Sequence, residues 1–174
     1  MGSIWETIAQ EATVESALWA ASLRPDGERR LEAVFSPLGD ERYALGLETI
    51  YEGYLLHYGR PRLFVPADGD TALLLGDYLF AHGLVRIARL EVVEAVVDLA
   101  ELISLCGQLR AEGRSDDGAP WAATASRLGA GGLDEGRAAL RTDGDAEPLL
   151  ELARRAAGAE AVERALAAHS SRVG

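Results

Sequence analysis

One apolar stretch decides the fold class: TALLLGDYLFAHGLVRIARL, from Thr71 to Leu90. It is too long for a strand and it is hydrophobic on nearly every side of a helix, a pattern that favours a buried helix. A membrane span would avoid the charges of Asp77, Arg86 and Arg89. We therefore expect the central helix of a soluble domain, and no transmembrane segment.

The chain on both sides of this stretch has helical patterns. The Val-rich segment Glu91–Glu112 has strand propensity, but its acidic residues recur at intervals of three, four and three residues, which aligns them on one helical face. Further helices are expected over Ile4–Leu23, Glu28–Phe35, Glu41–Tyr58, Trp121–Leu128, Glu135–Arg141, Ala146–Ala157 and Glu160–His169. The sequence predicts an all-α single domain over residues 1–174, with a core at about 41–112 and short Ala-rich helices of 119–170 docking on it.

Small and acidic residues mark how these helices begin and pack. Asp40 and Asp70 each precede a helical segment, so both are candidate N-caps. Ala72, Gly76 and Gly83 form a stripe of small residues along one helix. Such a stripe indicates either close packing of another helix or the wall of a lipid tunnel, and the sequence leaves both open.

The charge balance excludes several classes of function. The chain has 28 acidic residues and 17 basic ones, all arginine, for a net charge of −11. Scattered arginines among excess acids argue against nucleic-acid binding, and the absence of lysine excludes Walker-type phosphate loops and Schiff-base chemistry. The single Cys106 cannot form an internal disulfide, and the three histidines lack metal-ligand spacing. We expect a cytoplasmic protein.

Two motifs occur in order along the predicted core: LETIYEGYLLH at Leu47–His57 and ALLLGDYLFA at Ala72–Ala81. Together with a later Gly-Gln pair, they resemble consecutive helices of the trans-prenyl diphosphate synthases, the polyprenyl synthetase family. The matching positions are Glu48, Gly76, Asp77, Gly107 and Gln108. The resemblance implies an isoprenoid-synthase-like helical bundle, here a truncated one.

The family condenses two prenyl diphosphates and holds Mg²⁺ with two aspartate-rich motifs, because hard cations need clustered carboxylate oxygens. This chain departs from the family at those positions. Tyr58, Gly59 and Arg62 occupy the three aspartate positions of the first motif, and the family's basic stretch is reduced to Leu23-Arg24-Pro25. We therefore expect that Mg²⁺ binding is lost, with no metal site, no cofactor and no catalytic residue.

Three hypotheses about function remain open. The chain is a non-catalytic or regulatory subunit that pairs with a catalytic prenyl diphosphate synthase chain in isoprenoid biosynthesis. Alternatively, it is a stand-alone degenerate homologue that binds an isoprenoid or a prenyl diphosphate without turnover, through His57, Arg60 and Arg62. The third hypothesis is a helical protein-interaction module unrelated to isoprenoids.

An excess of apolar residues on one helix predicts association. Val92, Val93, Val96 and Val97 cover more circumference than a helix with one solvated side needs. We expect a dimer centred on Glu91–Leu109, formed either with a second copy or with a catalytic synthase, that buries more than about 1,000 Å².

Overall fold

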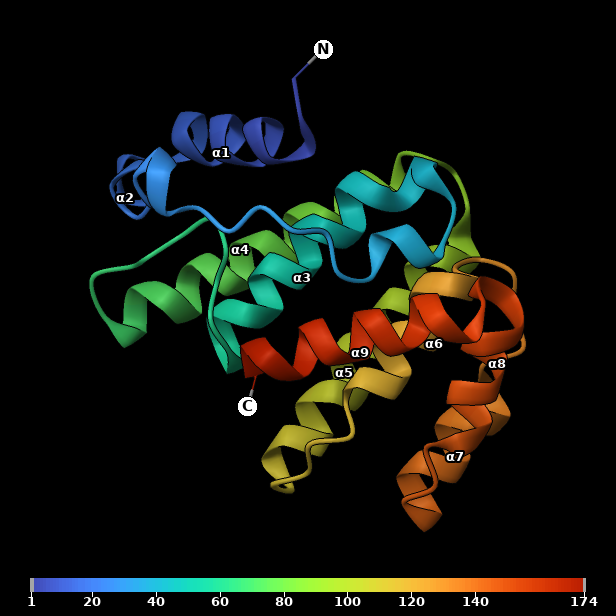
Figure 1. The fold of residues 1–174 in the computed structure, drawn as a ribbon. Coiled ribbons are helices and arrows are strands. Elements are labelled where there is room, and N and C mark those ends of the chain that lie inside the picture. The colour runs from blue at the N-terminus through green and yellow to red at the C-terminus, as the bar shows by residue number, and fades with distance from the viewer. Residues whose placement is uncertain (1, 174) are drawn as a thin grey trace.

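The computed structural model describes residues 2–173, which form helices joined by short loops (Figure 1). The α-helices are α1 (Ile4–Glu15), α2 (Ala17–Ala21), α3 (Ala44–Tyr58), α4 (Gly69–Ala88), α5 (Val93–Ala111), α6 (Gly118–Arg127), α7 (Asp134–Asp143), α8 (Glu147–Ala157) and α9 (Ala159–Val173). Three 3-10 turns, η1 (Asp26–Glu28), η2 (Ser36–Leu38) and η3 (Glu41–Tyr43), lie between α2 and α3. Residues 2–173 contain no strand, so the all-α prediction is confirmed, including the helix at the Val-rich segment.

The most buried long helix is α3, which lies between the N-terminal helices and the C-terminal ones (Figure 1). Every residue from Gly46 to Leu56 is buried. The prediction that Thr71–Leu90 forms the central helix is wrong, because α4 packs on α3 with one face only. About half of the surface of Leu73, Leu74 and Val85 remains exposed on its other side. Apolar composition all round a helix does not distinguish a fully covered helix from one with an uncovered apolar face.

Glycines bring α3 and α4 into close contact. A Cβ atom added at Gly53 would lie 2.9 Å from the carbonyl oxygen of Gly76, and one added at Gly83 would lie 3.1 Å from that of Gly46. At such separations a side chain on either helix would collide with the backbone of the other. The glycines of the small-residue stripe therefore serve close helix packing.

Three predictions about where helices begin and end are wrong. The segment Ile4–Leu23 is divided at Ser16, whose side chain accepts a hydrogen bond from the Leu18 amide and so begins a new helix. The helix predicted over Glu28–Phe35 is absent: residues 29–35 form no helix, and the chain there runs alongside the loop after α3, where the Arg30 amide donates to the Arg62 carbonyl. Asp68, not Asp70, caps α4 by accepting a hydrogen bond of 2.7 Å from the Thr71 amide.

The C-terminal helices complete the core. Residues 118–125 of α6 are all buried, and the Trp121 ring stacks on Phe35 and meets the edges of Tyr51 and Tyr54. Helix α6 thus belongs to the same hydrophobic cluster as α3 and α5. Within the described residues α4 alone is long and apolar enough to span a membrane by length and composition, a criterion that core helices also meet.

Candidate functional site

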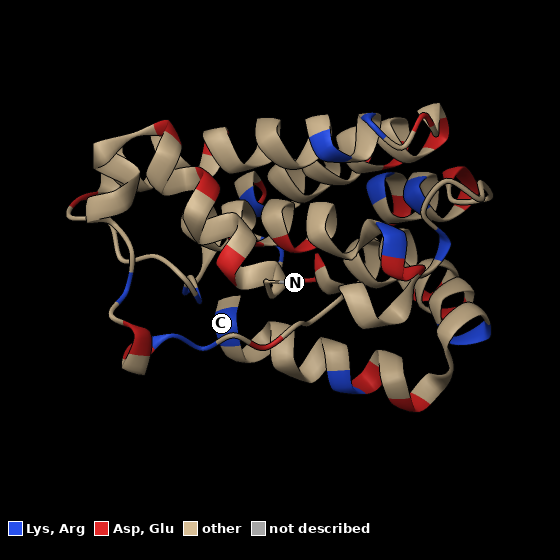
Figure 2. Ribbon diagram, turned by 90° about the horizontal axis from the view of Figure 1, so that it is seen from above, with Lys and Arg blue, Asp and Glu red and all other residues tan. Residues whose placement is uncertain are grey.

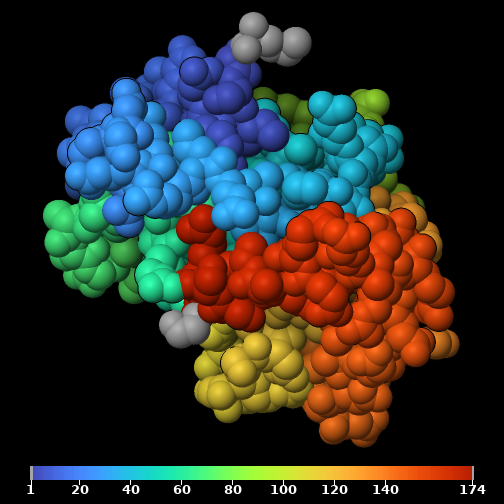
Figure 3. Space-filling view, viewed as in Figure 1, coloured from blue at the N-terminus to red at the C-terminus, as the bar shows by residue number. Residues whose placement is uncertain are grey.

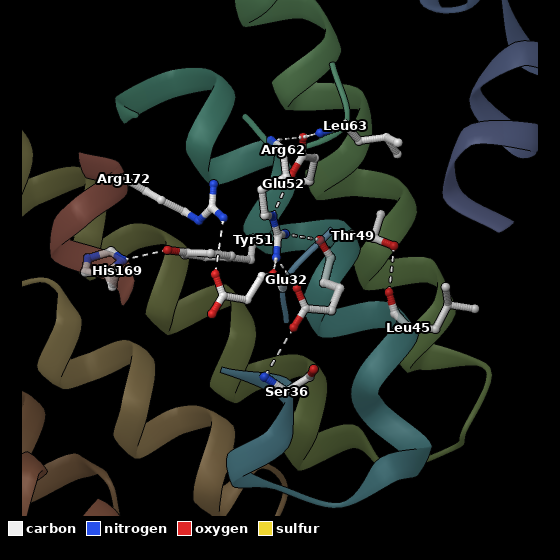
Figure 4. Close-up of polar contacts among 11 residues, drawn as sticks. Glu32, Ser36, Leu45, Thr49, Tyr51, Glu52, Arg62, Leu63, His169 and Arg172 are labelled. Carbon is white, nitrogen blue, oxygen red and sulfur yellow. Dashed lines mark hydrogen bonds and ion pairs between the residues drawn. The ribbon is translucent and has the colours of Figure 1, made fainter. Parts of the chain in front are cut away.

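The loop after α3, which the resemblance aligns with the family's first aspartate-rich motif, contributes to a buried ion cluster. Arg62 follows α3 in the chain and lies beneath it with no exposed surface. Its Nη1 lies 2.5 Å from Glu48 Oε2. Its Nε lies 2.9 Å from Glu52 Oε2 (Figure 4). The two glutamates are four residues apart on α3, so a single helical face presents both carboxylates to one guanidinium.

Backbone groups and aromatic rings complete this cluster. Glu52 Oε1 accepts hydrogen bonds from the amides of Arg62 and Leu63, at 2.8 and 2.7 Å. The guanidinium carbon lies 4.5 Å from the centre of the Trp5 ring and 4.9 Å from that of Tyr51. Burial alone would lower the pKa of Arg62, but the charges of the two glutamates raise it above its ordinary value, so the side chain stays cationic.

These residues do not fit a Mg²⁺ ion. The Arg62 guanidinium occupies the space between the two carboxylates that could otherwise act as ligands. The other two motif positions carry no ligand: Tyr58 packs its ring on Tyr54, and Gly59 ends α3 where a side chain would meet the carbonyl oxygen of Arg172. In residues 2–173 no three His, Cys, Asp or Glu side chains come together as a metal site would require.

The other family-matching positions fall in two further places. His57 Nε2 lies 3.1 Å from Asp77 Oδ1, and its ring stacks on Phe80 beside Gly76. Asp77 itself is largely exposed. On α5, Gly107 faces the Tyr58 hydroxyl, and Gln108 donates a hydrogen bond to Glu112 at the surface. A carboxylate beside His57 makes that position unfavourable for an anion.

Arg60 and Arg62, expected together as diphosphate ligands, are separated by the structure. Arg62 belongs to the closed cluster and is withdrawn from the candidate binding residues. Arg60 is exposed and borders an open cavity of about 490 Å³. The cavity is lined by Arg24, Glu28, Arg30, Arg60, Pro61, Ser171 and Arg172. Three segments meet at this face: the loop after α2, the loop after α3, and the end of α9 (Figure 3).

The structure contains a second buried polar network, which the sequence did not predict. Asp117 Oδ2 lies 2.8 Å from Arg110 Nη2 and 3.2 Å from His169 Nε2, and Tyr54 donates its hydroxyl to the same oxygen. The other nitrogen of His169 lies 2.8 Å from the Tyr51 hydroxyl. Burial works to raise the pKa of Asp117, but these partners outweigh it and lower that pKa to about 2.

This network ties α9 to α3, α5 and α6. Its members are spread from position 51 to position 169, so no local spacing reveals it. All but the half-buried Arg110 are closed off from solvent, which makes the network a structural one.

In comparisons with family models, curated proteins and solved structures the chain matches none of them, so the prenyl synthase resemblance rests on the quoted motifs.

Proposed function

We propose that this chain is a non-catalytic subunit that pairs with a catalytic prenyl diphosphate synthase chain in isoprenoid biosynthesis. The observation that carries the proposal is the burial of Arg62 between Glu48 and Glu52. The resemblance assigns Arg62 to one of the aspartate positions of the first metal motif, and in this chain that residue is a cation paired with two carboxylates of α3. A partner with intact aspartate motifs must then supply the metal chemistry.

The uncovered face of α4 is the surface proposed for this pairing. Leu73, Leu74 and Val85 lie on it, and Val93 and Val97 are also exposed, on the first turns of α5. Large exposed apolar patches are rare on monomeric soluble proteins, and where they occur they mark sites of contact with proteins or membranes. Because α3 covers only the glycine face of α4, a second helical chain can pack on the opposite side without disturbing the core.

The expected centre of association on α5 needs adjustment. Val92 and Val96 pack against the chain's own hydrophobic core, whereas Val93 and Val97 stay exposed. The buried leucines of α5 are likewise used within the chain. The proposed contact therefore moves from Glu91–Leu109 to the outer face of α4 and the beginning of α5.

Co-expression with a prenyl diphosphate synthase from the same organism tests the pairing. We expect the two chains to elute together in size-exclusion chromatography and Leu74→Arg to separate them, because a buried unpaired charge costs several kcal/mol. Leu18→Arg, the same change at an exposed leucine on α2, should leave the complex intact. Elution of the wild-type chain apart from every synthase that carries both aspartate motifs would contradict the proposal.

A lipid surface is the other class of occupant for an apolar helix face. Flotation of the purified chain with phosphatidylglycerol–phosphatidylcholine vesicles distinguishes the two. Pairing predicts that the wild-type chain stays in the protein fraction. If the chain floats with the vesicles and Leu74→Arg abolishes flotation, α4 faces a membrane and the pairing proposal is wrong.

A further inference from the structure

The cavity lined by Arg60 has a framework fixed by the backbone. The Arg24 amide donates to the Leu63 carbonyl at 3.0 Å, and the Arg30 amide donates to the Arg62 carbonyl at 3.2 Å. On the opposite side, the Arg60 amide donates to the Arg172 carbonyl at 3.0 Å. These bonds join the loop after α2, the loop after α3 and the end of α9. The positions of the arginine Cα atoms around the cavity are therefore held before any ligand arrives.

The charge balance at this cavity is the reverse of that of the whole chain. Among the described residues, five of the 17 arginines have no carboxylate within 4.0 Å: Arg24, Arg30, Arg60, Arg89 and Arg127. Three of these five line the one cavity. In a chain with 28 acidic residues, this cavity therefore carries a local excess of positive charge.

The fourth arginine of the cavity is only weakly neutralised. Arg172 lies 3.7 Å from Glu32 Oε2, and its Nε is buried without a hydrogen-bond partner. Of the described residues that line the cavity, Glu28 alone is acidic, and it is exposed. Among the described residues, four arginines at this cavity are thus accompanied by two carboxylates, those of Glu28 and Glu32. Basic residues, drawn in blue, lie on both the loop after α2 and the end of α9 (Figure 2).

The chemistry of these groups points to a particular ligand. Guanidinium groups present paired N–H donors whose spacing matches the oxygens of phosphate, and they keep their charge at all physiological pH values. An excess of about two positive charges is best balanced by an anion with two or more negative charges. The volume, about 490 Å³, lies within the range of small-molecule sites and exceeds what a single inorganic ion needs.

We propose that this cavity binds a small molecule that carries a phosphate or diphosphate group, held by Arg24, Arg30, Arg60 and Arg172 without a metal ion. Arg60 already donates from Nη2 to the Ser171 carbonyl, which fixes its direction at the rim. The proposal does not depend on the pairing proposed above, because it concerns the isolated chain. Its ligand is free in solution; a lipid headgroup shares the same chemistry and is separated from it by experiment.

Calorimetric titration of the purified chain with inorganic diphosphate in EDTA is the direct test. We expect saturable binding, and a drop in affinity of about tenfold or more for Arg30→Ala and for Arg60→Ala, because each charged hydrogen bond contributes about 1.5–3 kcal/mol. Arg30 is the cleaner variant, since its side chain is exposed and makes no hydrogen bond or ion pair in the described residues. Arg89→Ala, which removes an unpaired arginine away from this cavity, should bind as the wild type does.

Three results would overturn the proposal. The first is the absence of saturable binding by the wild-type chain. The second is an equal loss of affinity for Arg89→Ala and Arg30→Ala, which would indicate unspecific attraction of anions. The third is capture of the chain by phosphatidic acid vesicles without any binding of free diphosphate, which would assign the cavity to a lipid headgroup. Circular dichroism of each variant verifies that the fold is retained.

Discussion

Arg60 and Arg62 stand two residues apart in one loop but serve two different regions of the molecule. Arg62 has no exposed surface and lies between the two carboxylates of α3. Arg60 is exposed beside a cavity where cations outnumber acids. The residue type is the same, so the surrounding charge decides its role. An arginine whose charge is fully balanced inside the core holds the fold together, and one left unbalanced at a cavity is available to a ligand.

Replacing Arg62 should produce the largest effect. Arg62→Met leaves two carboxylates buried and unpaired, which costs about 3–5 kcal/mol of folding free energy. Arg60→Met removes an exposed side chain and should change that free energy by less than about 0.5 kcal/mol. Urea unfolding of the two variants measures the difference. Equal midpoints would show that the two regions do not differ as we describe.

A matched rescue sharpens this result. Combining Arg62→Met with Glu48→Gln and Glu52→Gln removes the unpaired charges, while the amide oxygens still accept hydrogen bonds from the backbone. The triple variant should therefore be more stable than Arg62→Met alone. A triple variant that is less stable would mean that packing of the Arg62 side chain, and not its charge, maintains this region.

The Asp117 network should respond to acid. The pKa of the Asp117 carboxyl is lowered from 3.8 to about 2. The stability that this carboxylate contributes is therefore present above pH 4 and is lost as the pH falls from about 4 to 2. A shift of this size corresponds to about 2.5 kcal/mol. Urea unfolding between pH 6 and pH 2 should show this loss for the wild type and a smaller one for Asp117→Asn. Identical acid profiles would remove Asp117 from the explanation.

Two glycines on neighbouring helices should give a smaller difference in stability when each is replaced by alanine, because Gly53 lies in a tightly packed position and Gly107 does not. Gly53→Ala places a Cβ 2.9 Å from the Gly76 carbonyl oxygen, which should cost about 2 kcal/mol through overpacking. Gly107→Ala meets only the Tyr58 hydroxyl at 3.6 Å, so higher helix propensity should stabilise the chain by about 0.5–1 kcal/mol. Thermal unfolding provides the measurement. Destabilisation by both variants would contradict the difference in packing.

Helix type and the C-terminal helices were predictable, because hydrophobic periodicity and Gly-marked turns are local properties of the sequence. The extent to which each helix is buried in the fold was not predictable. Helix α4 is as apolar as a core helix, yet one of its faces is uncovered, and only the tertiary structure shows which face α3 takes. The four-residue spacing of Glu48 and Glu52 was a usable signal for a shared buried cation. The arginine cavity gave no such signal, since its members come from three distant segments.

The central claim is that Arg62 neutralises Glu48 and Glu52, so that neither carboxylate is available to a metal ion. The most direct test is thermal unfolding of the purified chain in EDTA and in excess Mg²⁺, because an ion that binds only the native state raises the unfolding temperature. We predict the same unfolding temperature in both conditions. A saturable rise in the unfolding temperature with Mg²⁺, lost when Glu48 and Glu52 are both replaced by Gln, would contradict the account.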